Sequence, residues 1–346
     1  MDFKLAFIGF GTVGQGLAEI LVEKKDILSK KYDFHYTVVA ISDFIKGSVY
    51  DENGLDLKKI LELLNKGKKI DEYPSGIKGM DSLTTIKKTN ADTIIEVTYT
   101  DIKTGEPALT HIKTALNLGK NVVSTNKGPV VKEVNALLAL AKKKNVHYGF
   151  EGVVLAGTPA LNLAKFTLAG NKIRGFKGIL NGTTNYILTC MGEGKSYSDA
   201  LKKAQELGYA EADPTADVEG FDAMGKVVIL TNVVLEKNIT IDDVKRKGIT
   251  EITNEDIETA KAEGKVWKLI GSAEIQDDGS VKAKVWPEKI PLNDPLAGVS
   301  GATNALTYYT DELGAVTIVG PGAGKRETGF ALLIDLLEIN RKSKGL

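Results

Sequence analysis

The sequence predicts an α/β protein in which a doubly wound parallel sheet is followed by a second domain of the α+β class. Short apolar or β-branched segments alternate with helical segments over residues 1–150. A glycine-rich turn follows the first of these segments, and the regular alternation stops after Glu151. With 346 residues, the chain is long enough to fold as two domains.

The first domain is expected to span residues 1–150, and each of its elements has its own pattern. Residues 4–9 form a short apolar run that ends at a glycine, and apolar residues then repeat at helical spacing up to residue 28. Further strands are expected at residues 36–41, 93–97, 121–124 and 146–150. Helices are expected between them, at residues 57–64, 107–118 and 134–143.

The second domain is expected at residues 151–320, with strands and helices in a mixed order. Helical patterns occur at residues 159–168, 197–207 and 222–235. Strand patterns occur at residues 174–180, 281–287 and 316–319, and the alternation in the second of these favours a mixed or antiparallel sheet. An apolar helix at residues 329–339 follows a glycine-rich turn. We expect residues 321–346 to return to the first domain and complete it.

The charge balance and the cysteine content exclude several classes of protein. Lys and Arg together number 45, as do Asp and Glu, so the chain has no general attraction for nucleic acid or an anionic membrane. The single cysteine, Cys190, excludes an intramolecular disulfide, and no Cys/His cluster has zinc spacing. Neither a signal peptide nor a membrane-spanning run is recognisable. We therefore expect a cytoplasmic protein without nucleic-acid or membrane partners.

The glycine-rich turn has the spacing of a dinucleotide-binding loop. It reads Gly9-Phe10-Gly11-Thr12-Val13-Gly14 and lies between the first strand and a long helix. In a Rossmann domain the first glycine permits a tight turn and the second lets the backbone approach a pyrophosphate. The third lets helix and strand pack closely, and the N–H groups at the helix start favour the anion. We predict that these six residues bind NAD or NADP, rather than forming a turn without a ligand.

Asp43 is the candidate for recognition of the adenosine ribose. It follows the second strand, where an acidic side chain would accept a hydrogen bond from the ribose, although it lies further along the chain than usual. Lys46 is close enough in sequence to meet a 2′-phosphate instead. Asp43 is equally a residue that commonly forms turns. NAD and NADP therefore both remain open as the cofactor.

Longer segments resemble homoserine dehydrogenase. They are residues 100–109 (TDIKTGEPAL), 125–129 (TNKGP), 181–188 (NGTTNYIL), 208–223 (GYAEADPTADVEGFDA) and 320–324 (GPGAG). The resemblance spans nearly the whole chain and implies the reversible NAD(P)H-dependent reduction of L-aspartate 4-semialdehyde to L-homoserine, in threonine, methionine and isoleucine biosynthesis. Because the chain ends at Leu346, without the regulatory domain of some relatives, we expect no strong threonine feedback.

The resemblance places the proton donor at Lys226. Hydride addition to the semialdehyde puts charge on the carbonyl oxygen, so a proton donor or cation must lie there. Asp222 precedes Lys226 by four residues on the same predicted helix, which puts both on one face. Without the resemblance they would be interpreted as a surface ion pair. With it, Asp222 is expected to hold Lys226 and the substrate hydroxyl in line.

The resemblance also implies contacts for the substrate and the nicotinamide. Lys127 is expected between the two, as a catalytic residue that contacts both. Glu211 is implied as the ligand of the substrate ammonium, with Asp217 in support. Further implied contacts are Gly182 and Thr183 for the substrate, and Thr98 and Gly322 for the cofactor. Taken singly, these residues would be a surface lysine, loop acids and a helix cap or turn.

The loop that follows the first domain resembles the family's monovalent cation site. Its oxygen ligands would be Glu151 and the backbone carbonyls of Val154, Ala156 and Thr158, which suit Na⁺ or K⁺ as hard cations. The alternative is a structural hinge between the domains. The resemblance also implies a homodimer, and we expect the second domain to carry both dimerisation and substrate binding.

Two other functions compete with this interpretation. An aldehyde-oxidising semialdehyde dehydrogenase needs a cysteine nucleophile, for which Cys190 is the single candidate. Its position on a predicted helix between apolar residues favours a buried structural thiol. A non-catalytic NAD(P)-binding regulator would keep the glycine-rich loop, but it would not need Lys127, Asp222 and Lys226.

Overall fold

The structure is a computed structural model that describes residues 2–345. The chain forms two compact units. One runs to Gly157 and resumes at Gly324, and the other comprises Thr158–Ala323. The first unit therefore includes the loop after residue 150, which we had expected to belong to the second domain.

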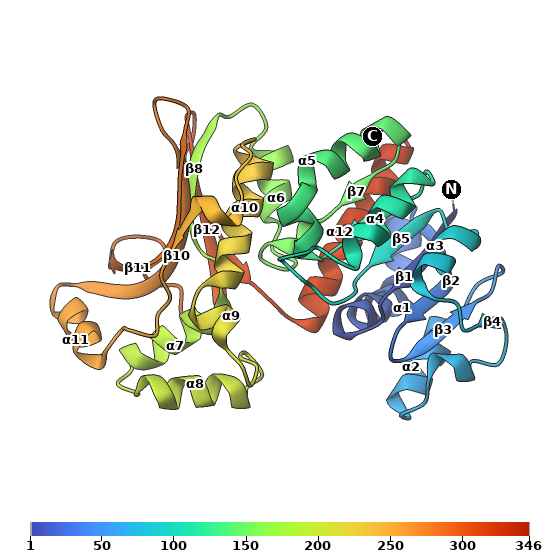
Figure 1. Ribbon diagram of the computed structural model, residues 1–346, viewed down its shortest axis with the longest axis horizontal. Coiled ribbons are helices and arrows are strands. Elements are labelled where there is room, and N and C mark those ends of the chain that lie inside the picture. The colour runs from blue at the N-terminus through green and yellow to red at the C-terminus, as the bar shows by residue number, and fades with distance from the viewer. Residues whose placement is uncertain (1, 346) are drawn as a thin grey trace. The chain divides into compact units, whose positions relative to one another are not determined.

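A seven-stranded sheet with the order β4-β3-β2-β1-β5-β6-β7 forms the first unit (Figure 1). Its parallel strands are β1 (Asp2–Ile8), β2 (His35–Asp43), β5 (Thr93–Glu96), β6 (Asn121–Ser124) and β7 (Tyr148–Gly149). Strand β1 pairs with β2 on one side and with β5 on the other, so the winding reverses there. This reversal is the switch point at which such folds bind ligands. The predicted doubly wound parallel sheet is confirmed.

Two short strands extend the sheet at one edge and were not predicted. β3 (Gly47–Tyr50) and β4 (Ile77–Lys78) pair antiparallel beside β2. Their sequences are short and partly polar, which leaves no periodic signal to recognise. An antiparallel edge on a parallel sheet is common in folds of this class.

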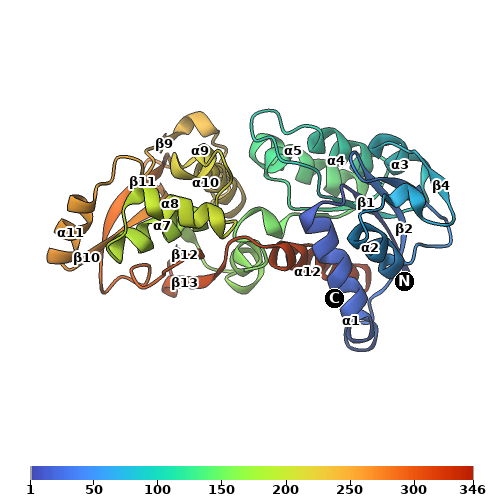
Figure 2. The same ribbon diagram turned by 90° about the horizontal axis from the view of Figure 1, so that it is seen from below.

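Helices cover the sheet of the first unit (Figures 1 and 2). They are α1 (Thr12–Tyr32), α2 (Leu57–Asn65), α3 (Ser82–Lys88), α4 (Ala108–Asn117), α5 (Lys127–Lys144) and α12 (Lys325–Ser343). The second half of strand β1 is a continuous apolar run because it is buried on both faces, and its Leu5, Phe7 and Ile8 have no exposed surface.

The last helix, α12, packs along α1 within the first unit. Gly16 of α1 and Gly329 of α12 make this approach possible, because a Cβ at either position would collide with the backbone of the other helix. Two ion pairs flank the contact: Lys325 Nζ lies 2.5 Å from Glu19 Oε1, and Arg326 Nη2 lies 2.6 Å from Glu23 Oε2.

The second unit is built on a six-stranded sheet with the order β13-β12-β8-β10-β11-β9. The strands are β8 (Ile173–Ile179), β9 (Val244–Arg246), β10 (Lys265–Ile275), β11 (Val281–Pro291), β12 (Thr303–Thr310) and β13 (Gly314–Pro321). All neighbours pair antiparallel except β9 and β11, which are parallel. Of the two predicted alternatives, a mixed or an antiparallel sheet, the structure has the mixed one.

The helices of the second unit are α6 (Ala160–Asn162), α7 (Gly182–Gly192), α8 (Tyr197–Glu206), α9 (Thr215–Val218), α10 (Phe221–Val234) and α11 (Asn254–Ala262). α10 packs on one face of the sheet, where its Val227 lies against Gly271 of β10. The helix expected at residues 159–168 is α-helical only in α6 and continues as a π-helical turn over Leu163–Thr167.

No helix between residues 2 and 345 combines the length and the apolar character needed to cross a membrane.

Candidate active site

The three glycines of the dinucleotide loop lie in three different structural environments. Gly9 has a φ of +88°, and a Cβ there would lie 2.6 Å from the carbonyl oxygen of Val97. A Cβ on Gly14 would lie 3.2 Å from the carbonyl oxygen of Gly9, so this glycine lets α1 start close to β1. At Gly11 a Cβ would meet no described atom within 4 Å. The loop is therefore closed on the side of β5 and open at its second glycine, where a pyrophosphate would approach.

Asp43 lies beside this loop, at the end of β2. Its Oδ2 accepts a hydrogen bond from the backbone N–H of Phe10 at 2.7 Å. Its Oδ1 accepts from the N–H groups of Ile45 at 3.0 Å and Lys46 at 2.8 Å. Asp43 thus forms the turn between β2 and β3, as one of its two interpretations predicts, and it also contacts the glycine-rich loop. Recognition of a ribose by Asp43 stays a prediction. A carboxylate can accept about four hydrogen bonds, which leaves capacity for a ribose hydroxyl.

Thr98 and Lys127 follow the ends of the neighbouring strands β5 and β6. Lys127 is the first residue of α5, because the Oδ1 atom of Asn126 caps this helix by accepting from Gly128 N–H at 3.2 Å. The backbone of α5 is non-helical at Glu133 (φ −146°, ψ 31°), so the helix predicted from residue 134 corresponds to the part after this kink. The Nδ2 group of Asn126 donates to the carbonyl of Tyr99 at 2.9 Å, which ties the loop after β5 to the start of α5. Within the first unit, the structure thus gathers the predicted cofactor residues at the switch point.

Lys226 and Asp222 form a largely buried pair on α10 in the second unit. The Nζ atom of Lys226 lies 2.7 Å from Asp222 Oδ2 and donates to the carbonyl of Leu180 at 2.6 Å. The side chains are 7% and 16% exposed, so this is not the solvated pair that four-residue spacing alone suggests. A buried ammonium held by a carboxylate is a directed proton donor, and the neutral amine that remains is a proton acceptor.

Asn181 joins this pair to a second carboxylate. It was not among the site residues predicted from the sequence. It caps α7, because its Oδ1 accepts from Thr184 N–H at 2.9 Å. Its Nδ2 donates to Asp217 at 2.6 Å and to Asp222 at 3.0 Å. An Asn before Gly-Thr-Thr is a recognisable helix cap, but its contacts 36 and 41 residues away leave no mark in the sequence.

Asp217 lies in a largely buried position that raises the pKa of its carboxyl. Burial is the main cause, and the hydrogen bond from Asn181 opposes it. The neighbouring charge of Asp222 raises this pKa further, whereas Lys226 lowers it. The two carboxylates, the ammonium and the Asn181 amide therefore form one polar cluster of opposite charges.

The other acids of residues 211–222 do not join this cluster. Glu219 binds Arg246 and accepts from Thr250 Oγ1 at 2.9 Å, and Asp213 caps the turn at Thr215. The acids of residues 211–222 therefore lie in separate environments. Glu211 is exposed, on the loop that leads from α8 to α9.

Thr183 and Gly182 form the first turn of α7. The hydroxyl of Thr183 donates to the carbonyl of Tyr209 at 2.6 Å, which holds the loop before Glu211 against this helix start. A Cβ on Gly182 would lie 2.6 Å from the carbonyl oxygen of Ala302, so only glycine fits there. Gly322 is similarly confined, because a Cβ would collide with the side chain of the buried Asn304.

The loop proposed for a cation has an unusual backbone. Glu151 is 2% exposed, and its N–H donates to Asp335 Oδ2 at 3.0 Å. Leu155 and Ala156 both have positive φ, 55° and 48°, which is rare for residues with a side chain. Such strain concentrates at functional loops. In residues 2–345, no three acidic, histidine or cysteine side chains are grouped as ligands of a metal ion.

The position of Cys190 bears on the competing function of an aldehyde-oxidising semialdehyde dehydrogenase. Cys190 is buried in α7, at 3% exposed, which suits a structural thiol.

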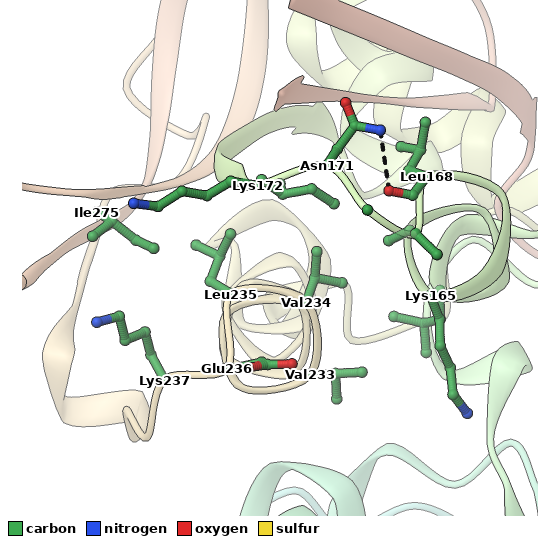
Figure 3. Close-up of a pocket in the computed structure, with 15 residues that line it drawn as sticks. Lys165, Leu168, Asn171, Lys172, Val233, Val234, Leu235, Glu236, Lys237 and Ile275 are labelled. Carbon is green, nitrogen blue, oxygen red and sulfur yellow. Dashed lines mark hydrogen bonds between the residues drawn. The ribbon is translucent and has the colours of Figure 1, made fainter. Parts of the chain in front are cut away.

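A cavity of about 590 Å³ opens in the second unit beside the end of α10 (Figure 3). Its wall combines apolar side chains, such as Leu168 and Leu235, with the lysines Lys165, Lys172 and Lys237, and it contains none of the predicted site residues.

Comparison with known proteins decides the family. A model described as homoserine dehydrogenase matches residues 159–337. A model described as glutamate/leucine/phenylalanine/valine dehydrogenase matches residues 2–108. A relative named NAD(+)-dependent homoserine dehydrogenase, from Pseudomonas canavaninivorans, is 44% identical over 99% of this chain and 97% of its own length. The chain belongs to the homoserine dehydrogenase family.

Other members of the homoserine dehydrogenase family are similar to this chain over nearly its full length. Homoserine dehydrogenase of Methanocaldococcus jannaschii is 45% identical over 98% of this chain and 99% of its own. The solved structure of a hyperthermophilic archaeal homoserine dehydrogenase in complex with NADPH has a TM-score of 0.85 at 29% identity, covering 99% of this chain and 98% of that one. The activity is that of an NAD(P)-dependent oxidoreductase acting on a CH–OH group of a small molecule, in amino-acid biosynthesis.

Proposed function

We propose that Lys226 is the proton donor in the reversible reduction of L-aspartate 4-semialdehyde to L-homoserine. The observation that carries the proposal is its burial beside Asp222, at 2.7 Å, with the Leu180 carbonyl as second acceptor. The bound nicotinamide supplies the hydride that adds to the carbonyl carbon. Lys226 delivers a proton to the carbonyl oxygen as charge develops there, and Asp222 keeps the ammonium oriented. In the oxidation of homoserine, the same amine takes the hydroxyl proton.

The other contacts of the substrate are proposed on the family resemblance. Glu211 is the proposed ligand of the substrate ammonium, supported by Asp217, and the start of α7 at Gly182 and Thr183 lies on the substrate side. Lys127 is proposed to lie between nicotinamide and substrate. Its place at the start of α5, at the switch-point end of the sheet, supports this role.

For the cofactor, we propose that residues 9–14, Thr98 and Gly322 contact the dinucleotide and that NAD is preferred over NADP. The carboxylate of Asp43 is anchored on Phe10 of the glycine-rich loop, where a ribose 2′-hydroxyl is a good partner and a 2′-phosphate is repelled. The relative from P. canavaninivorans is named for NAD(+), while the archaeal enzyme was solved in complex with NADPH, so both dinucleotides occur in the family.

Na⁺ or K⁺ is the proposed occupant of the loop formed by Glu151, Val154, Ala156 and Thr158. The left-handed residues in this loop turn successive carbonyls, and the Glu151 carboxylate supplies a negative charge. Such a cation would stabilise the loop that leads from one unit into the other.

A homodimer through the open face of the second sheet is the proposed assembly. On the face opposite α10, Trp286, Tyr309 and Val319 are 40%, 42% and 53% exposed, although they lie within β11, β12 and β13. Exposed apolar side chains on a sheet face are typical of protein interfaces. Trp286→Lys is expected to shift the protein toward monomer in light scattering.

The enzymatic proposal is tested by initial rates of homoserine oxidation with NAD⁺ and with NADP⁺, followed by absorbance of the reduced cofactor. Turnover with a higher kcat/KM for NAD⁺ is the expected result. The absence of turnover with both would overturn it. Cytoplasmic location and the absence of nucleic-acid or membrane partners stay predictions, which cell fractionation and binding assays would check.

A further inference from the structure

Glu96, the last residue of β5, is a buried carboxylate to which no role has been assigned so far. Its side chain has no exposed surface. Its Oε1 accepts from the N–H of Thr98 at 3.3 Å and, in a short hydrogen bond, from the hydroxyl of Thr98. Its Oε2 accepts from the hydroxyl of Ser124 at 3.2 Å. A carboxylate this deep is costly unless its acceptors are satisfied, and here they are.

The contacts of Glu96 reach three other elements. His111 of α4 places Nδ1 3.4 Å from Oε1 and is itself nearly buried. Ser124, at the end of β6, donates to Glu96 and accepts from Asn126 N–H at 3.0 Å. Asn126 is the cap of α5, whose first residue is Lys127. One carboxylate therefore joins the loop after β5 to the start of α5 through a continuous set of hydrogen bonds.

The direction of these bonds constrains what Thr98 can offer a ligand. A hydroxyl carries one proton and two lone pairs, and the proton of Thr98 is directed at Glu96. Thr98 is only partly buried, so its oxygen can still accept a hydrogen bond. The groups on the nicotinamide half of a dinucleotide that can donate are the ribose hydroxyls and the carboxamide NH₂.

We propose that Glu96 is a positioning residue for the nicotinamide half of the cofactor. It orients Thr98 as a hydrogen-bond acceptor for that half and holds the Ser124–Asn126 connection that begins α5. The inference rests on the proposed function only in taking Thr98 as a cofactor contact. It predicts an effect confined to the nicotinamide half, because the proposed contacts of the adenosine and pyrophosphate part, Asp43 and the glycine-rich loop, are held by a hydrogen bond of their own between Asp43 and Phe10.

The experiment compares NADH with ADP, which lacks the nicotinamide ribose, in binding to wild type, Glu96→Gln, Thr98→Val and the double variant. Glutamate accepts from Thr98 with one oxygen and from Ser124 with the other. Glutamine has a single acceptor oxygen, so one of these two donors loses its acceptor. We expect NADH to bind about tenfold more weakly to Glu96→Gln, with ADP affinity unchanged. In the Thr98→Val background, Glu96→Gln should have clearly less effect, because the two residues act through one hydroxyl.

Two further variants make the result decisive. Thr98→Ser keeps the hydroxyl and should keep NADH affinity, and Glu62→Gln, the same change at an exposed residue of α2, should alter neither ligand. Equal weakening of NADH and ADP, unchanged NADH binding to Glu96→Gln, or strictly additive effects would each overturn the proposal. Because binding is measured without substrate, failure here is separate from failure of homoserine turnover, which would instead remove the proposed function.

Discussion

The ammonium of Lys226 lies 2.7 Å from the carboxylate of Asp222, one helical turn away on α10, and both side chains are largely removed from solvent. Lys226→Met keeps the apolar stem and removes the proton. Because general acid–base groups contribute about 100- to 10,000-fold, we expect kcat for homoserine oxidation to fall by that factor. NADH affinity should stay within about twofold. Lys202→Met, on the exposed face of α8, is the matched control, and full turnover by Lys226→Met would refute the assigned role.

Asp43→Asn is predicted to relax the discrimination against NADP⁺. The variant removes a negative charge but leaves an amide oxygen for the Phe10 N–H. Repulsion of a 2′-phosphate over several ångströms amounts to about 1–2 kcal/mol at a protein surface, so the kcat/KM ratio for NADP⁺ over NAD⁺ should rise about tenfold. Asp26→Asn, on exposed α1, should leave the ratio unchanged. An unchanged ratio in Asp43→Asn would place cofactor discrimination elsewhere.

Monovalent cations are predicted to support activity. When K⁺ and Na⁺ are replaced by tetramethylammonium at constant ionic strength, turnover should fall severalfold, since a large cation cannot be ligated by carbonyls. Glu151→Gln should raise the K⁺ concentration needed for half-maximal rate. Identical rates in all three salts would favour the structural hinge instead.

Asn181→Ala is predicted to impair both stability and pH response. Loss of the α7 cap costs about 1 kcal/mol, which lowers Tm by a few degrees. Without the Asn181 hydrogen bond, the raised pKa of Asp217 rises further, so the acidic limb of the kcat/KM profile should move to higher pH. Ser196→Ala removes the cap of α8, away from the carboxylates, and should lower Tm without moving the profile. If Asn181→Ala and wild type had the same pH profile of kcat/KM, Asn181 would have no role in the reaction.

Lys268 is predicted to make stability depend on alkaline pH. Its Nζ donates to Asn185 Oδ1 at 3.0 Å and to the Val299 carbonyl, and burial lowers its pKa from 10.5 to about 8. Between these values the unfolded chain binds more protons than the folded one, so this group adds stability as pH rises from about 8 to 10.5, by roughly 3 kcal/mol. Denaturant unfolding of wild type and Lys268→Met should show this slope only in wild type. Parallel curves would contradict it.

The first sheet was predictable because its signals are local. The apolar run of β1, the spacing of residues 9–14 and the helical repeat of α1 each lie within a few residues, and the burial of a parallel strand produces such a run directly. The early start of α5 also had a local signal, the cap Asn126 followed by Pro129, which the apolar pattern alone obscured.

The candidate site was predictable only in part. Resemblance pointed to Asp217, Asp222 and Lys226, but the amide that joins them comes from Asn181, across a long chain separation. The hydrogen bonds of Glu96 show the same limit, since its partners belong to three different elements. β10 and β12 escaped prediction because one face of each mixes polar and apolar residues, and their pairing in the sheet defines them.

The contact between α12 and α1 has a consequence for synthesis on the ribosome. Residues 158–323 form a continuous unit that can fold once it has emerged, whereas the dinucleotide-binding unit still lacks the helix that seals α1. All the residues between them must be translated before Gly329 can meet Gly16. The part of the protein that is made first is therefore completed last, and a truncated chain would expose the apolar surface of α1 to chaperones and proteases.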